Sequence, residues 1–377
     1  MPRDINNRIE QLRTRRAGMD RLERLNEQAR YDVLAKSLVP EPWQKRVGKP
    51  HTKYALGAMQ EVDADYTRIS IETAERVGRQ LDAGLTTAGF SVEFRLQGSV
   101  PLNVHIRGVS DVDLLNLETG FLTYDTGGAR SAAGQYRNPT IRTSVDVLSN
   151  LRREAERILK NKYPATTVDT SGGKAISISG GSLARPVDVV PSHWHDTIDY
   201  QRFGQEHDRG VTILDKKVPE ALQNLPFLHI KRVGERDEAV MDSLRKAIRL
   251  CKNLKSDANE EGRNVNLPSF DIAATMYHAN LDALRSGAVY ELGILAEAQR
   301  HLDFLARNVT YAATLTVPDG SRRIFNTGAK IEGLIALSIE FDELAREVAK
   351  EQNSHLATYD APPLDASRAV LSSIYVP

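Results

Sequence analysis

Apolar residues recur along the chain with two different spacings, which predicts a protein that contains both helices and strands. Apolar positions three or four residues apart, set among many charged ones, predict long helices at residues 4–38 and 55–85. The second helix is expected to stop before Gly89, where the pattern changes. Alternating or continuous apolar runs bounded by small residues then predict strands at 93–97 and 112–117.

A second group of strands is predicted after a helix at residues 140–160. The Gly, Ser and Thr content of residues 120–138 predicts a loop before that helix. Glycine pairs then separate three short apolar runs, a spacing that is typical of an antiparallel meander. The three runs lie at 166–170, 174–179 and 185–190.

The helical spacing returns in the second half of the chain and dominates it. Helices are predicted at 237–255, 269–283, 288–307 and 328–352. The last stretch, 356–377, contains a proline pair and is expected to form an extended tail. Prolines also predict a loop at 43–52, between the first two helices. The fold class is therefore expected to be α+β, with a helical second half.

Composition indicates an ordinary globular protein and excludes several function classes. The 377 residues are 41% hydrophobic and 27% charged, which is enough for a large core. The formal net charge is zero, which argues against a constitutive nucleic-acid coat, although the arginine-rich first segment could touch one. Cys251 is the single cysteine, so no disulfide framework is expected. No apolar run approaches the roughly 18 residues of a membrane span, and the protein is expected in the reducing cytoplasm.

Two acids and a Gly-Ser pair flank a short loop between the first two predicted strands. Asp111 and Asp113 open the second strand, and side chains two apart on a strand point to the same face. Two carboxylates aimed together repel unless a cation lies between them, and hard oxygen ligands suit Mg²⁺ or Mn²⁺. Gly98 allows the backbone to approach a ligand closely, and Ser99 adds a hydroxyl group. The Gly-Ser pair alone and the Asp-x-Asp pair alone are each common on protein surfaces. Together they predict a phosphate-binding loop that faces a divalent-metal site.

A third acid, Asp188, interrupts the apolar run 185–190. An unpaired carboxylate in such a strand is costly, and a metal ion would satisfy it. A salt bridge to Arg185, or a position at the edge of the sheet, is the alternative. The predicted meander would place Asp188 in the same sheet as Asp111 and Asp113, so that three acids could share one site.

The predicted helix 237–255 has an apolar stripe and a basic face opposite to it. The basic face carries Arg245, Arg249, Lys252 and Lys255. It is either a solvated helix face or the cationic partner of a triphosphate near the acids. Ser269 begins the next helix, and a helix N-terminus with a free hydroxyl is also an anion site. His193 and His195 would share one strand face, but no further soft ligand is near enough in sequence to predict zinc.

In this order the motifs resemble the cGAS/DncV-like nucleotidyltransferases, the bacterial CD-NTases, of the DNA polymerase β superfamily. The resemblance is carried by the Gly-Ser pair, the three acids, the helical sequence 244–255 and the Pro-Ser-Phe sequence 268–270, and it covers residues 55–285. It implies a polymerase β-like nucleotidyltransferase core, with a mixed or antiparallel sheet and a long spine helix, plus a C-terminal helical domain. The implied domains are an N-terminal helical extension, a catalytic core, and a helical lobe with a tail, at residues 1–54, 55–200 and 201–377.

The resemblance also implies a site. Three catalytic carboxylates would hold two Mg²⁺ or Mn²⁺ ions that activate a ribose hydroxyl and stabilise the pyrophosphate leaving group. These carboxylates are Asp111, Asp113 and Asp188. The nucleoside triphosphate would be bound by the Gly-Ser pair, a lysine, a serine, and an aromatic ring that stacks on a base. These residues are Gly98, Ser99, Lys252, Ser269 and Phe270.

The implied activity joins nucleoside triphosphates such as ATP and GTP into a cyclic di- or trinucleotide, a second messenger of CBASS-type antiphage defence. The expected partners are the nucleotides, with room for a regulatory protein, whereas neither a membrane nor an obligatory nucleic acid is expected. Two alternatives stay open: a transferase of the same fold that modifies tRNA, protein or a small acceptor, and a non-catalytic nucleotide-sensing module. No P-loop or dinucleotide fingerprint supports a kinase or a dehydrogenase.

Overall fold

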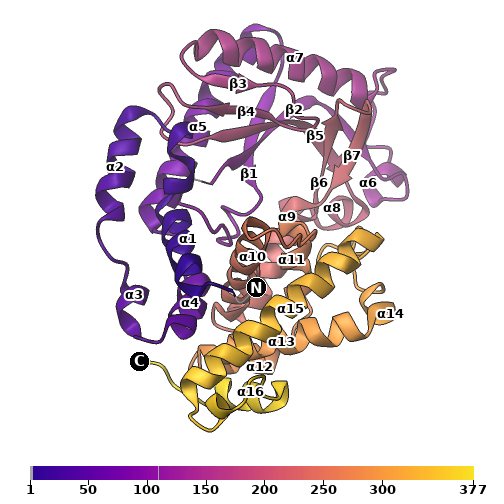
Figure 1. Ribbon diagram of the computed structural model, residues 1–377. Coiled ribbons are helices and arrows are strands. Elements are labelled where there is room, and N and C mark those ends of the chain that lie inside the picture. The colour runs from indigo at the N-terminus through magenta and orange to yellow at the C-terminus, as the bar shows by residue number, and fades with distance from the viewer. Residues whose placement is uncertain (1–2, 109) are drawn as a thin grey trace.

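The computed structural model describes residues 3–108 and 110–377, which form a sheet lobe and a helical lobe (Figure 1). The sheet lobe lies at the top of the view, the C-terminal helices lie below it, and the N-terminal helices run along one side of both. Every helix of the described residues is too short or too polar to cross a membrane. The predicted α+β fold class is confirmed.

Seven strands form one mixed sheet in the order β1-β2-β5-β4-β3, and β6 and β7 extend it from the distal part of β5. The strands are β1 (Val92–Gln97), β2 (Val112–Tyr124), β3 (Thr167–Asp169), β4 (Ile176–Ser179), β5 (Val187–Asp196), β6 (Gly210–Asp215) and β7 (Glu220–Asn224). β2 and β5 run parallel, and the other pairs are antiparallel. The parallel register sets Asp113 directly opposite Asp188.

Two amphipathic helices, α5 (Ala64–Thr87) and α7 (Ser144–Lys162), cover one face of this sheet. Their apolar residues recur three or four positions apart, so each helix buries one stripe in the core it shares with the strands. Thr143 and Asp146 form a capping box at the start of α7, which fixes where that helix begins. The long α5 lies directly before β1, where the spine helix was expected.

A second apolar core joins the C-terminal helices to helices from the N-terminal segment. The C-terminal helices are α9 (Pro226–Glu238), α10 (Ser243–Glu260), α11 (Ser269–Tyr277), α12 (Leu281–Ser286), α13 (Leu292–Arg307), α14 (Val309–Ala312), α15 (Gly328–Gln352) and α16 (Leu364–Leu371). Leu12, Trp43 and Tyr54 of the N-terminal segment belong to the same core as Leu250 and Phe341. The predicted domain boundary at residue 54 stays a prediction.

Both long helices predicted for the first part of the chain are wrong as single elements. Residues 4–38 form α1 (Ile5–Ala17), the 3₁₀ helix η1 (Met19–Arg24) and α2 (Glu27–Ser37). Gly18, in the left-handed conformation with φ of 76°, ends α1, and Asn26 caps the start of α2. Residues 55–85 belong to α4 (Pro50–Met59) and α5, because Asp63 caps a new helix start.

Several further boundaries also differ from the predictions. The expected loop at 43–52 is largely helical, because α3 (Pro42–Arg46) and α4 both start at prolines, which suit the first turn of a helix. β2 extends into the expected loop 120–138, because it pairs with β5 along nearly all of its length. The tail 356–377 is not extended, since α16 packs against α13 and α15. The predicted helix 237–255 corresponds to α10, although its first two residues end α9, and the predicted helix 269–283 is divided between α11 and α12.

Candidate active site

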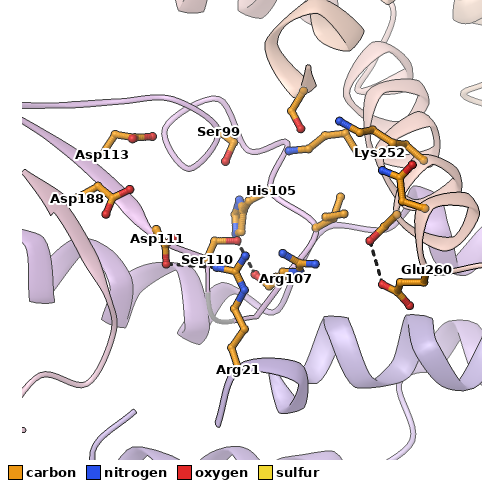
Figure 2. A pocket seen from close by; sticks show the side chains of 15 residues that line it. Arg21, Ser99, His105, Arg107, Ser110, Asp111, Asp113, Asp188, Lys252 and Glu260 are labelled. Atoms are coloured by element: carbon orange, nitrogen blue, oxygen red, sulfur yellow. Dashed lines mark hydrogen bonds and ion pairs between the residues drawn. The ribbon is translucent and has the colours of Figure 1, made fainter. Parts of the chain in front are cut away.

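Asp113 and Asp188 extend from neighbouring parallel strands into one cavity of about 660 Å³ (Figure 2). Burial, together with the nearby charges of Asp188 and Asp111, raises the pKa of Asp113 to about 7. Burial likewise raises the pKa of Asp188, whose Oδ1 atom is buried with no hydrogen-bond partner among the described residues. Desolvated carboxylates that repel one another call for a cation, and their hard oxygen atoms fit Mg²⁺ or Mn²⁺.

Asp111 precedes β2, and its carboxylate is turned toward the N-terminal segment. Arg24 Nη1 lies 2.8 Å from Asp111 Oδ1 and 3.0 Å from Oδ2, and Arg21 Nη1 lies 3.3 Å from Oδ1. All three acids line the same cavity, but within the described part of the chain no group of three acidic, histidine or cysteine side chains is arranged to hold a metal ion. The predicted convergence of Asp111 and Asp113 on one point is therefore absent here, because the arginines hold Asp111 aside.

The Gly-Ser loop brings the backbone close to these acids. Gly98 has a φ of 81°, and a Cβ atom at this position would collide with Asp113 Oδ2. Ser99 follows and lines the cavity, while its carbonyl accepts a hydrogen bond of 3.0 Å from the amide of Val104. Val100 is buried in the sheet-lobe core and anchors the loop. Glycine is thus required at position 98 both for its backbone conformation and for the space that Asp113 occupies.

The opposite side of the cavity is cationic, and Lys252 of α10 lies there. Only 8% of Lys252 is exposed, and its Nζ atom donates a 2.6 Å hydrogen bond to the carbonyl of Val104. Burial, reinforced by the positive charges of Lys255, Arg107 and Arg249, lowers the pKa of Lys252 to about 7. A lysine in this state gains charge when an anionic ligand arrives, so Lys252 is suited to bind a triphosphate.

The solvated basic face considered for this helix is not what the structure contains. Arg249 is buried, and it donates to the carbonyl groups of Met59 at 2.8 Å and Asn103 at 3.1 Å. Arg245 Nη1 lies 2.9 Å from Asp237 Oδ2 of α9. These two arginines hold α10 against its neighbours, whereas Lys252 and Lys255 of the same face line the cavity together with Ser99 and Ser269.

Ser269 and Phe270 begin α11 and lie where a second cavity, of about 680 Å³, meets the first. The two cavities share Ser99, Asp113, Lys252 and Ser269. The ring of Phe270 is 40% exposed and stacks on His229, with 4.2 Å between the ring centroids and 26° between their planes. Burial lowers the pKa of His229 to about 4, so the stacked pair is neutral. The guanidinium group of Arg322 also lies over the Phe270 ring, 5.3 Å from its centroid. An aromatic surface near Lys252 suits a nucleobase with its phosphates.

Sequence patterns did not indicate the arginines and the histidine of this cavity or its rim. They are Arg21, Arg24, His105 and Arg107. The excess of arginine before residue 25 was the available signal, but it is also typical of a solvated helix. The turn at Gly18, which brings those arginines to the acids, depends on packing that the sequence pattern does not reveal.

His193 and His195 both lie on β5 and are buried. His193 Nε2 lies 2.9 Å from Ser144 Oγ, and His195 Nδ1 lies 2.9 Å from Thr123 Oγ1. Both imidazoles therefore have protein partners that account for their position in the sheet.

Comparisons with known proteins place these features in context. No protein-family model matches the chain. Over 356 residues it is 42% identical to the cyclic dinucleotide synthase CdnE of Yersinia aleksiciae, which covers 91% of this chain and 92% of that protein. It is 31% identical to a c-di-GMP synthase of Lachnospiraceae bacterium (strain RUG226) over 284 residues, 69% of this chain and 80% of the relative. The solved STING-associated CdnE c-di-GMP synthase from Capnocytophaga granulosa superimposes with a TM-score of 0.68 at 27% identity, covering 95% of this chain and all of that one (100%).

Proposed function

Because the chain belongs to the CdnE-type cyclic dinucleotide synthases of the cGAS/DncV-like nucleotidyltransferases, we propose that Asp111, Asp113 and Asp188 carry out its reaction with two divalent ions. The predicted family and the cyclic dinucleotide synthase activity are confirmed by the relatives. The observation that carries the residue assignment is the facing pair of desolvated acids, Asp113 and Asp188, in a cavity that also contains Ser99 and Lys252.

The roles of the residues follow from where they lie. When bound, the ions would supply Lewis acidity for the attacking ribose hydroxyl and for the pyrophosphate that leaves. Asp188, with an unpartnered Oδ1 atom among the described residues, would face the attacking hydroxyl. The Ser99 and Ser269 hydroxyl groups would donate to phosphate oxygens, and Lys252 would neutralise their charge. Phe270 would hold a base by stacking.

We propose GTP as a substrate and a cyclic dinucleotide that contains guanine as the product. The support is the c-di-GMP synthase activity named for the Lachnospiraceae and Capnocytophaga relatives. The description of the Capnocytophaga enzyme as STING-associated supports a second-messenger role in antiphage defence, with a receptor protein that reads the product. We also propose a cytoplasmic location, which suits the free thiol of Cys251.

Synthesis should not require nucleic acid. The arginine-rich N-terminal segment was the main reason to consider a polymer, but three of its arginines, Arg8, Arg15 and Arg16, are buried in ion pairs within the protein. Arg8 contacts Glu261, Arg15 contacts Asp257, and Arg16 contacts Glu41, each within 2.8 Å. Arginines that are buried in ion pairs are not available to bind phosphates of a polymer. A regulatory protein and the division into residues 1–54, 55–200 and 201–377 remain part of the proposal.

The test is a reaction of nuclease-treated protein with all four nucleoside triphosphates and Mg²⁺ or Mn²⁺, followed by mass spectrometry of the products. A cyclic dinucleotide and pyrophosphate are expected without added RNA or DNA. Asp113→Asn and Asp188→Asn should yield no detectable product, whereas Asp82→Asn, at an exposed site on α5, should match wild type. Wild-type yield from either site variant would refute the residue assignment, and label in RNA or protein would favour the transferase alternative.

A further inference from the structure

The side chain of Asp111 is neutralised by the protein itself. Arg24 Nη1 approaches both carboxylate oxygens, at 2.8 and 3.0 Å. Arg21 Nη1 lies 3.3 Å from Oδ1 (Figure 2). Among the described residues, Asp113 and Asp188 form no such ion pair. Asp111, one of the three proposed metal ligands, is therefore already paired with positive charges. The other two, Asp113 and Asp188, face one another without an ion-pair partner among the described residues.

The backbone that carries these arginines is held firmly in place. Before η1, in the last turn of α1, the Arg15 carbonyl accepts a 3.0 Å hydrogen bond from the amide of Gly108, and at the end of η1 the Arg24 carbonyl accepts one of 3.1 Å from the amide of Gly180. Next to Arg21, Asp20 Oδ2 lies 2.9 Å from Arg107 Nε. η1 is thus fixed between the loop that precedes Asp111 and the turn after β4.

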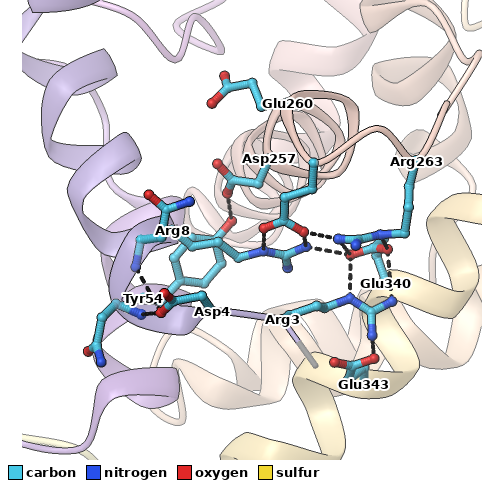
Figure 3. Close-up of polar contacts among 12 residues, drawn as sticks. Arg3, Asp4, Arg8, Tyr54, Asp257, Glu260, Arg263, Glu340 and Glu343 are labelled. Atoms are coloured by element: carbon cyan, nitrogen blue, oxygen red, sulfur yellow. Dashed lines mark hydrogen bonds and ion pairs between the residues drawn. The ribbon is translucent and has the colours of Figure 1, made fainter. Parts of the chain in front are cut away.

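The preceding helix α1 is anchored by a buried network of charges (Figure 3). Arg8 contacts Glu261 and Glu340, each at 2.8 Å, and Arg15 contacts Asp257 at 2.6 Å. The side chains of Arg8 and Glu340 are 3% and 1% exposed. Breaking such pairs leaves a buried charge without a partner, which is strongly unfavourable. The N-terminal segment is therefore a fixed part of the site and not a lid that opens.

The arginine side chains, in contrast, have room to move. The exposed fractions are 22% for Arg21, 24% for Arg24 and 27% for Asp111. Arg21 also lines the cavity that contains Ser99 and Lys252, where the phosphates are proposed to bind. An ion pair that is this exposed is weak enough to exchange partners when a better one arrives.

We propose that Arg21 and Arg24 act as an internal cation that competes with divalent metal for Asp111, so that metal loading depends on the nucleotide. Without nucleotide, a metal ion has to displace two guanidinium groups from Asp111. With nucleotide, the phosphate oxygens offer those groups new acceptors, and Asp111 becomes free to bind the ion. The arginines are positioning residues that act through Asp111, and the proposal rests on the metal assignment above. Its effect is that the metal site is completed only when a nucleotide is bound.

The test measures Mn²⁺ binding by electron paramagnetic resonance, first with Mn²⁺ alone and then with a non-hydrolysable GTP analogue. In Arg21→Gln/Arg24→Gln, the affinity for Mn²⁺ alone should rise roughly 3- to 30-fold, because two partly exposed ion pairs no longer compete. The factor by which the analogue strengthens Mn²⁺ binding should fall correspondingly. Arg24→Lys, which retains the charge, and Arg13→Gln, at an exposed site of α1, should bind Mn²⁺ like wild type.

Unchanged or weaker binding of Mn²⁺ alone by the double variant would overturn the proposal and leave the arginines as structural anchors of η1. Arg21→Gln, which removes the longer of the two contacts, provides the same comparison if the double variant does not fold. If no protein binds Mn²⁺ even with the analogue, the metal assignment itself fails. Equal binding by wild type and variant would reject the arginine competition alone.

Discussion

Replacing Asp113 by asparagine should stabilise the metal-free protein at alkaline pH while it abolishes synthesis. The pKa of Asp113 is raised from 3.8 to about 7, with burial as the main cause. An acid whose pKa is raised by folding is held in its neutral form by the folded state. It therefore has no effect on stability below pH 4, and it destabilises the fold increasingly as the pH rises toward 7.

The size of the effect follows from this shift in pKa. At about 1.4 kcal/mol per unit, the full penalty on the free energy of folding is about 4 kcal/mol above pH 7. Asp188 shares the titration, and a buried amide needs hydrogen bonds of its own, so we expect a net gain of about 1–3 kcal/mol at pH 8. At pH 4, close to the ordinary pKa of 3.8 for this carboxyl group, most of this gain should be lost and mainly the cost of the buried amide should remain.

The measurement is urea unfolding in EDTA at pH 4 and pH 8, followed by thermal melting with and without Mg²⁺. Mg²⁺ should stabilise wild type, because it binds the folded state, and should stabilise Asp113→Asn much less. Asp82→Asn serves as the matched control at an exposed site. The reasoning is refuted if Asp113→Asn is less stable than wild type at pH 8 in EDTA, or if Mg²⁺ stabilises both proteins equally.

Three further predictions follow from the same structure. Burial lowers the pKa of Lys252 to about 7, so Lys252→Met should be more stable than wild type below pH 7, and this gain in stability should shrink as the pH rises toward 10.5. Its affinity for a GTP analogue, measured by titration calorimetry, should be at least about tenfold weaker. Gly98→Ala should abolish product formation, whereas Gly89→Ala, with a similar φ of 85° but open space around it, should cost about 1–2 kcal/mol in a urea melt and keep activity. Burial opposes ionisation of Glu340, but hydrogen bonds from arginines outweigh it and lower the pKa of Glu340 to about 2. Glu340→Gln should therefore lose about 3–5 kcal/mol of folding stability at pH 7, and this loss should become smaller as the pH falls from 4.5 toward 2. An equal loss of stability at pH 2 and pH 7 would contradict this prediction.

The acids and the Gly-Ser loop could be predicted from sequence because their geometry is local. Alternation along a strand fixes the face of Asp113, and an apolar run with a single acid predicts that Asp188 needs a partner. The order of these motifs along the chain was specific enough to identify the family, which the relatives confirm. Short-range patterns thus sufficed to predict that Asp113 and Asp188 lie in one sheet.

Features that depend on packing between distant segments could not be predicted. The basic face of α10 has the same pattern whether it meets water or protein, and only the fold buries Arg249 and Lys252. The N-terminal segment has a continuous helical composition, yet it turns at Gly18 so that Arg21 and Arg24 reach Asp111. The sequence pattern identifies these charges but does not identify the residues they meet.

The parallel pairing of β2 with β5 also determines when the protein can begin to work during its synthesis. Asp113 meets Asp188 only after α7, β3 and β4 have been made and the chain has folded back on itself. Contacts between residues that are distant in sequence form slowly, because closing the intervening loop costs entropy. Lys252 and Ser269 leave the ribosome later still, so a chain interrupted before α10 carries the three acids and Ser99 but lacks Lys252 and Ser269, which are proposed to bind the triphosphate. Translation products that end before α10 are therefore expected to make no cyclic nucleotide.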